Sequence, residues 1–183
     1  MEEKSPIAKT SIPGLLLIQR PTFSDERGFF RESARIAEIE EAAGVSFDIA
    51  QVNHARSSKN TLRGIHAAPW NKLIYVVSGK VQQVVVDLRE NSPTFGKYES
   101  FILGDENRSS IFIPADLGNA YLVLSDEADY VYLTDQEWEP NREKGVAWND
   151  PDLNIAWELE GEAVLSEKDQ KNPPLKTVFP NKF

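Results

Sequence analysis

The residue best suited to proton transfer is His66, which closes the segment LRGIH at residues 62–66. Among protein side chains, histidine has the ordinary pKa closest to neutral pH, so it is the natural general base. Such a base needs a carboxylate to orient its ring, and the C-terminal segment offers Asp169. A lone histidine is more often a structural hydrogen-bonding residue, and composition alone does not say that these two side chains meet.

Three basic residues are candidates for holding an anion or stabilising a developing negative charge. Arg27 and Arg63 each precede a glycine. Glycine lets the backbone approach a ligand closely, and a guanidinium group matches phosphate oxygens. An arginine followed by a glycine is more often a surface residue at a turn. Lys72 lies just before an apolar run at residues 73–77, where it could place an ammonium group at the mouth of a barrel.

Aromatic residues form a second group of candidates. Tyr130 and Tyr132 alternate along an apolar segment and would share one face of a strand. Inward-facing tyrosines usually belong to the core, with the hydroxyl bound by a neighbour. A phenol beside a histidine could instead donate a proton. Trp138 is either a packing anchor or part of the lining of a site.

Composition excludes several classes of protein. The 183 residues include no cysteine and only two histidines, which excludes disulfides, thiolate sites and multi-histidine metal centres. The net charge of −9 repels nucleic acid and anionic membranes. The polar first residues do not resemble a secretory signal, and no apolar run is long enough to cross a bilayer. We therefore expect a cytoplasmic protein with no metal or cofactor and no nucleic-acid or membrane partner.

The elements that must position these residues are mostly short strands. A helix is predicted at residues 33–43, a tight turn at 78–80, irregular chain at 158–164 and a capped turn or short helix at 166–170. The predicted strands are residues 15–18, 73–77, 81–86, 98–103, 110–113, 121–124 and 128–133. This spacing predicts an all-β, antiparallel sandwich or jelly roll. We expect one domain over residues 1–183, with an N-terminal arm at about 1–20 and an irregular tail at about 138–183.

Taken together, these segments resemble the dTDP-4-dehydrorhamnose 3,5-epimerases, which are jelly-roll enzymes of the cupin type. The resemblance runs from about Ile12 to Leu175. No single motif is specific, but their number and order are. The matching segments are residues 23–30 (FSDERGFF), 51–54 (QVNH), 57–58, 62–66 (LRGIH), 86–89 (VDLR), 92–96 (SPTFG), 122–125 (LVLS), 148–151 (WNDP) and 165–169 (LSEKD).

The resemblance implies roles for individual residues. His66 would remove a proton next to the C4 ketone of a nucleotide-linked sugar, with Asp169 as its orienting partner. Tyr132 would return a proton to the opposite face, and Lys72 would lie near the developing enolate. The resemblance also implies a homodimer without metal or cofactor, in which the N-terminal segment of one subunit reaches into the site of the other. The implied substrate contacts are Arg27, Phe30, Glu32, Gln51, Asn53 and Arg63.

The chain also departs from the family pattern. Asn119 stands where the family typically has a second histidine; its amide can hydrogen-bond a keto oxygen or hydroxyl but cannot carry a proton. The loop at residues 66–72 is shorter than usual. Trp138 and Leu133 stand where the family commonly has a tyrosine and a lysine, respectively. These changes lie at the sugar end of the implied pocket, so we count Asn119 and Trp138 among the substrate contacts and expect a shifted substrate.

Three functions are compatible with these residues. The first is an epimerase acting at C3, C5 or both carbons of a 4-keto-6-deoxyhexose or related heptose linked to dTDP, CDP or GDP, in surface polysaccharide or deoxysugar biosynthesis. Its basis is the presence of His66, Tyr132 and Asp169 together. The second is a non-catalytic jelly roll that binds a nucleotide sugar or serves as a partner subunit, which Asn119 and the short loop would favour. A keto-sugar isomerase ranks third, because such enzymes pair two histidines.

Overall fold

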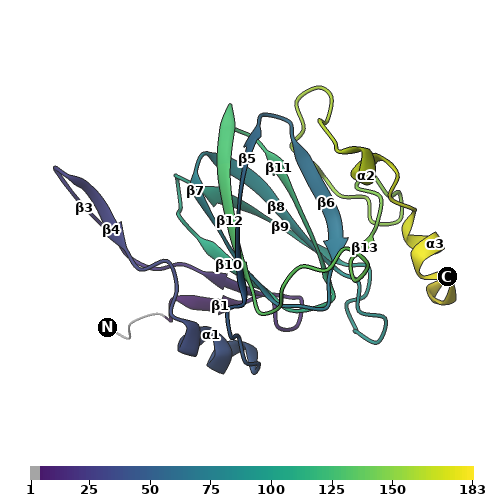
Figure 1. The fold of residues 1–183 in the computed structure, drawn as a ribbon, viewed down its shortest axis with the longest axis horizontal. Coiled ribbons are helices and arrows are strands. Elements are labelled where there is room, and N and C mark those ends of the chain that lie inside the picture. The colour runs from purple at the N-terminus through teal and green to yellow at the C-terminus, as the bar shows by residue number, and fades with distance from the viewer. Residues whose placement is uncertain (1–4) are drawn as a thin grey trace.

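Two antiparallel sheets face one another in the computed structural model, which describes residues 5–183 (Figure 1). One sheet has six strands in the order β1 (Ile7–Lys9), β2 (Leu16–Ile18), β10 (Ser110–Ile113), β7 (Lys72–Ser78), β12 (Glu127–Thr134) and β5 (Gln51–Ser58). The other has five, in the order β13 (Lys144–Gly145), β6 (Leu62–Ala67), β11 (Leu117–Val123), β8 (Lys80–Asp87) and β9 (Tyr98–Gly104). This is the predicted all-β jelly roll.

Helices and a separate hairpin surround the two sheets. The helix α1 (Ile36–Ala43) buries Ile39 against the six-stranded sheet and ends at Gly44. Three short helical segments, α2 (Glu167–Gln170), α3 (Leu175–Val178) and the 3₁₀ turn at Pro180–Lys182, lie in the tail beside the five-stranded sheet (Figure 1). The predicted cap of α2 is present, because the Ser166 hydroxyl accepts a hydrogen bond from the backbone N–H of Asp169.

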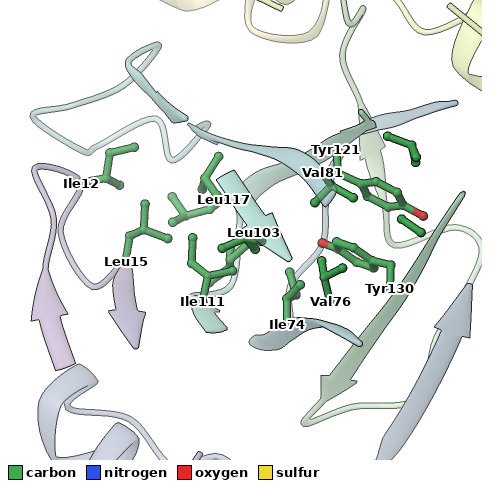
Figure 2. Packing of buried hydrophobic residues seen from close by; sticks show 14 residues of the cluster. Ile12, Leu15, Ile74, Val76, Val81, Leu103, Ile111, Leu117, Tyr121 and Tyr130 are labelled. Atoms are coloured by element: carbon green, nitrogen blue, oxygen red, sulfur yellow. The ribbon is translucent and has the colours of Figure 1, made fainter. Parts of the chain in front are cut away.

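The space between the sheets holds the main core, which is aliphatic at one end and aromatic at the other. Figure 2 shows Ile12, Leu15 and Ile111 toward one end of the cluster and the paired rings of Tyr121 and Tyr130 at the other. The two tyrosine rings stack with centroids 4.0 Å apart. The polar cavity described below begins at this aromatic end.

Every strand predicted from the sequence is present, although β11 begins at Leu117 rather than at residue 121. The sequence prediction missed β5 and β6, which carry many of the candidate site residues. β5 has a period-two burial pattern, but the residues on it are mostly polar, so no apolar alternation marks it as a strand. The predicted tight turn is present too, with Gly79 at φ +87° between β7 and β8.

The projecting element at the N-terminal end is a hairpin rather than the expected arm. Residues 7–9 and 16–18 form β1 and β2 of the six-stranded sheet, whereas residues 1–4 lie outside the described part of the chain. The hairpin consists of β3 (Thr22–Asp25) and β4 (Gly28–Arg31), and it extends away from both sheets (Figure 1). Its Phe23, Phe29 and Phe30 are 67%, 53% and 71% exposed.

No helix within residues 5–183 is long and apolar enough to cross a membrane.

Candidate active site

A polar cavity of about 250 Å³ opens between the two sheets, next to the stacked tyrosines. Strands of both sheets line it, together with residues from the tail that close one side. Its lining includes Asn53, Arg63, His66, Lys72, Asn119, Tyr130, Tyr132, Trp138, Glu143 and Asp169. The structure therefore brings together all four predicted catalytic residues and four of the eight predicted substrate contacts.

A β-bulge explains how Arg63 and His66 both reach this cavity. Residues three apart on a regular strand point to opposite faces. Here Arg63 pairs with Tyr121 and His66 with Asn119, so two residues of β6 stand opposite the single Ala120 of β11. The bulge needs Gly64, whose φ is +138° and where a Cβ would clash with that of Ala120. The glycine of the segment LRGIH is thus required by the backbone conformation of the bulge.

His66 and Asp169 form a hydrogen-bonded pair, as the family resemblance implies. His66 Nε2 lies 2.6 Å from Asp169 Oδ1. Burial raises the pKa of the Asp169 carboxyl, whereas hydrogen bonds from His66, Ser166 and the backbone of Gly64 lower it. The hydrogen bonds have the larger combined effect, so the pKa lies below its ordinary value. Because the carboxylate accepts the Nε2 proton, Nδ1 is the ring nitrogen able to accept another. Asp169 is only 4% exposed, so the carboxylate is shielded from water, whereas the His66 ring is partly exposed toward the cavity.

The phenols of Tyr130 and Tyr132 stand on the opposite sheet. They share one face of β12, with ring centroids 6.2 Å apart. Burial raises the pKa of Tyr132 above its ordinary value and raises that of Tyr130 much further. Both phenols are therefore protonated at neutral pH and able to donate. Since Tyr132 belongs to the six-stranded sheet and His66 to the five-stranded one, the two side chains reach the cavity from opposite walls.

Lys72 begins β7 with its side chain in the cavity and is only 5% exposed. Burial lowers its pKa to about 8, a shift that nearby Glu143 partly offsets and Lys168 reinforces. Glu143 accepts a hydrogen bond from Lys168 at 3.0 Å. Burial raises the pKa of Glu143, but Lys168, His66 and Lys72 together hold it below the ordinary value. Sequence reasoning missed both residues: Glu143 lies in irregular chain with no pattern to mark it, and Lys168 lies in the predicted LSEKD turn, where only Asp169 was assigned a role.

Amide side chains order two parts of the lining. Gln51 donates to Asn53 Oδ1 at 2.6 Å, and its own carbonyl oxygen accepts the backbone N–H of Trp138 at 2.8 Å. Gln51 therefore supports the lining without being part of it. Asn119 Oδ1 accepts a hydrogen bond of 2.6 Å from Gln83, which sequence reasoning also missed.

Three predicted contacts, Arg27, Phe30 and Glu32, lie away from this cavity. Arg27 stands at the tip of the hairpin and pairs with Asp25. Phe30 and Glu32 border a larger, open hollow of about 1160 Å³ between the base of the hairpin, β1 and α1. Glu32 forms ion pairs there with Arg20 and Arg35. Within one chain, these residues do not contribute to the site around His66.

Within residues 5–183, no group of three or more histidine, aspartate or glutamate side chains is arranged to hold a metal ion. The prediction that the protein uses no metal or cofactor stays a prediction.

The fold and the cavity define the class: a jelly-roll protein of the cupin type with a polar cavity between its sheets that holds a hydrogen-bonded histidine–aspartate pair. The model of the dTDP-4-dehydrorhamnose 3,5-epimerase family matches residues 9–177. The chain belongs to this family, and it is accordingly an isomerase.

Individual relatives agree with this assignment. The dTDP-4-dehydrorhamnose 3,5-epimerase of Shigella flexneri is 41% identical over 167 residues, covering 89% of this chain and 92% of the relative. The structure of an epimerase from Legionella pneumophila in complex with dTDP-4-keto-L-rhamnose has a TM-score of 0.90 at 36% identity, covering 97% of this chain and 96% of that one. ChmJ, a 3'-monoepimerase from Streptomyces bikiniensis in complex with dTDP-quinovose, has a TM-score of 0.89 at 38% identity, covering 94% and 89%.

Proposed function

We propose that the protein inverts C3, C5 or both carbons of a nucleotide-linked 4-keto sugar, with His66 as base and Tyr132 as acid. The observation that carries this proposal is the 2.6 Å pair of His66 and Asp169 in a cavity whose opposite wall presents Tyr132. Inversion at carbon requires a proton to leave one face and another to arrive at the other face. A base and an acid on opposite walls meet that requirement.

The proposed reaction has two proton transfers. His66 Nδ1 takes the proton from the carbon next to the ketone, and the electron pair of that C–H bond moves onto the C4 oxygen as an enolate. The enolate then collapses and takes the phenolic proton of Tyr132 on its other face. Exchange with water restores neutral His66 and protonated Tyr132. The ammonium group of Lys72, which is charged below about pH 8, stabilises the enolate while it exists.

The substrate class rests on relatives and on the lining together. Structures of relatives hold dTDP-linked sugars, so dTDP is the carrier we expect first. Arg63 lines the cavity and donates to the Ser57 hydroxyl at 3.2 Å, which leaves further guanidinium N–H groups to bind diphosphate oxygens. Asn53 and Trp138 line the same cavity and supply amide and aromatic contacts.

The test is proton NMR in heavy water with dTDP-, CDP- and GDP-linked 4-keto sugars. We expect deuterium to enter C3 or C5 of at least one of them, with a change in configuration at that carbon. Tyr132→Phe should keep the exchange but reduce inversion by roughly 10²- to 10⁴-fold, the range for a lost general acid. Absence of exchange with every carrier, alongside measurable binding of a nucleotide sugar, would favour the non-catalytic alternative.

We also propose that the hairpin completes the site of a second copy in a homodimer. Its three exposed phenylalanines give an isolated two-stranded ribbon an apolar surface, which is unfavourable in water. Its residue Arg27, which the family resemblance assigns to the substrate, is 85% exposed at the side chain and remote from the cavity of its own chain. Insertion of the hairpin into the cavity of a second copy would bury the phenylalanines and bring Arg27 to a substrate.

Mixing two inactive variants tests this arrangement. Arg27→Ala and His66→Ala should each lose activity, and a mixed dimer should regain it, because one of its two sites then holds both native residues. A mixture of Asp169→Ala with His66→Ala is the matched control, since both changes affect the same chain's cavity and should not complement. Sedimentation of the wild-type protein as a monomer at assay concentration would contradict the proposal.

A further inference from the structure

Gln83 is a fully buried polar residue beside the cavity. It lies on β8 at 0% exposure, with Tyr121 of β11 and Phe101 of β9 as its register partners. A buried amide is costly unless its donors and acceptor are all bound. All of its hydrogen bonds lead to residues of the cavity wall or to the backbone there.

The orientation of the Gln83 amide follows from its neighbours. Its nitrogen lies 3.1 Å from the carbonyl oxygen of Val84 and 3.0 Å from that of Ala120. Carbonyl oxygens only accept hydrogen bonds, so this end of the side chain must be the donor Nε2. The other end, Oε1, accepts the Tyr130 hydroxyl at 2.7 Å.

The fixed Gln83 amide in turn orients Asn119. Gln83 Nε2 donates to Asn119 Oδ1 at 2.6 Å, which turns Asn119 Nδ2 away from Gln83. Within residues 5–183, Asn119 Nδ2 makes no hydrogen bond, although the side chain lines the cavity. Asn119 is the register partner of His66 on the adjacent strand, so its side chain stands on the same face as the proposed base.

We propose that Gln83 is a positioning residue, which holds the Asn119 amide so that its Nδ2–H groups donate to the keto oxygen of the sugar. This inference rests on the proposed function and deepens it. The Asn119 amide then stabilises the enolate oxygen as a neutral donor, and His66 next to it is the proposed base. Asn119 would be the catalytic contact, and Gln83 would act only through it.

The substitution Gln83→Glu separates positioning from mere packing. The introduced carboxyl group, while protonated, can donate to Asn119 Oδ1 as the native amide does. Once ionised, the same group can only accept, so the Asn119 amide must turn its Nδ2 toward the carboxylate and present Oδ1 to the sugar. Burial against the carbonyl oxygens of Val84 and Ala120 raises the pKa of such a carboxyl, which brings the switch into the measurable pH range.

Other titratable groups near this position do not imitate the switch. Those facing it are the phenols of Tyr130 on β12 and Tyr121 on β11, together with His66 on β6 beyond Asn119; Phe101 of β9 carries no charge. Burial raises the pKa of both phenols, so neither ionises near neutral pH. His66 is common to the wild type and the variant, and the Asn119 signals of the Gln82→Glu control separate its influence from that of the introduced carboxyl group.

The experiment compares the pH profile of Gln83→Glu with that of the wild type, using the deuterium-exchange assay. We expect the kcat of Gln83→Glu, divided by that of the wild type at the same pH, to fall by roughly 10- to 100-fold as pH rises. KM should change little, as for a misdirected oxyanion donor. Gln82→Glu is the matched control, because Gln82 is the adjacent buried glutamine of β8 and instead donates to Ser100 and to the carbonyl of Ala156. Its ratio should stay constant with pH.

A second readout needs no turnover. In ¹⁵N-labelled protein, the Asn119 side-chain amide signals should shift with pH in Gln83→Glu and stay constant in the wild type and in Gln82→Glu. A pH-independent ratio of kcat values together with unmoved Asn119 signals would overturn the proposal. If the wild type shows no deuterium exchange with any 4-keto sugar, the proposed function is overturned. Asn119 signals that still shift with pH in Gln83→Glu would then leave the positioning by Gln83 supported.

Discussion

The cavity has two adjoining halves that differ in how they are built. The imidazole half consists of His66 and Asp169, and the amide half of Asn119, Gln83 and Tyr130. His66 and Asn119 are register partners on neighbouring strands. Asp169 reaches His66 from a short helix of the C-terminal tail, whereas Gln83 and Tyr130 reach Asn119 from strands of the barrel itself. One half therefore depends on the docking of the tail and the other on the core.

The two halves also differ in electrostatics. The imidazole half is surrounded by charge, since Glu143, Lys72 and Lys168 all act on one another nearby. The amide half holds neutral groups whose hydrogen bonds are nearly all satisfied within the barrel. A titratable pair can move protons, and a neutral, fixed amide can stabilise charge without exchanging any. The difference suggests a division of labour: proton transfer in one half and binding of the keto oxygen in the other.

The largest effect should come from removing the base. His66→Ala should lower solvent exchange at both carbons by roughly 10³- to 10⁴-fold, because the group proposed to take the proton is removed. Proton NMR in heavy water measures the rate. The matched control is His54→Ala: His54 sits on the outer side of β5, bound to Asp129, and does not line the cavity. Exchange at the wild-type rate in His66→Ala would assign the base elsewhere.

The next effect concerns the charge of Lys72. With a pKa of about 8, the ammonium form dominates at pH 7 and disappears as pH rises through about 8. If the ammonium stabilises the enolate, kcat should fall on the alkaline side of about pH 8. Lys72→Met should lower kcat by roughly 10²- to 10³-fold at pH 7, the range for a lost oxyanion donor.

The alkaline limb distinguishes this role from packing. The Lys72→Met variant should lose the fall in kcat near pH 8 while its residual activity remains measurable. Lys80→Met, a change to a half-buried lysine that pairs with Glu106 and does not line the cavity, should keep the wild-type profile. An unchanged alkaline limb in Lys72→Met would show that another group causes it.

A smaller loss is expected from Asp169→Asn, on the order of 10²-fold in kcat, because the ring stays but its orienting charge does not. The variant should fold, since an amide can still accept the Nε2–H bond. The measurement is the exchange rate beside a melting curve. A loss of stability that accounts for the whole loss of activity would mean that Asp169 only anchors the tail.

Asp87 provides the control for Asp169, because it is a buried carboxylate that does not line the cavity. Burial raises its pKa, whereas hydrogen bonds from Arg89, Ser92 and Thr94 lower it by more, so that the pKa is about 2. Because the folded pKa lies below the ordinary value, the carboxylate stabilises the fold above about pH 4, and this contribution is lost as pH falls toward 2. Asp87→Asn should therefore cost about 1–3 kcal/mol of stability at pH 7 and leave exchange per folded molecule unchanged.

The sequence predicted the barrel because its strands carry an apolar pattern. The strands with apolar runs were all located, while β5 and β6 were missed because polar residues on them point into the cavity or toward solvent. A functional site thus removes the periodicity by which its own strands would be recognised. The hairpin was missed for a related reason: Phe23, Phe29 and Phe30 are exposed, so no buried face exists to set a period.

The residues at the site divide in the same way. Residue type and family resemblance together indicated His66 and Asp169, but only the fold shows that they meet. Gln83 could not be predicted, because a glutamine within a β-strand has no distinguishing spacing. Glu143 comes from irregular chain, whose path depends on tertiary contacts rather than on local pattern. The bulge at Gly64 is equally non-local, since Ala120 determines it.

The smallest expected effect is that of Asn119→His, which would convert the amide half into a second imidazole. Gln83 presents a fixed N–H to this position, because its carbonyl end is held by Tyr130. A neutral imidazole can accept that bond with one nitrogen and donate its other N–H into the cavity, as Asn119 does now. We therefore expect kcat to change by less than about 10-fold on the native substrate, since a donor to the keto oxygen is retained.

The more sensitive readout of this substitution is selectivity. A ring is bulkier than an amide and places its N–H differently, so relative rates across the panel of 4-keto sugars should change more than the rate on the best one. Protonation of the new imidazole would set two N–H groups against each other at Gln83, so the variant should also lose activity on the acid side relative to the wild type. An unaltered order of substrates together with an unaltered acid limb would mean that residue 119 does not touch the sugar, and the amide half would then be a structural element alone.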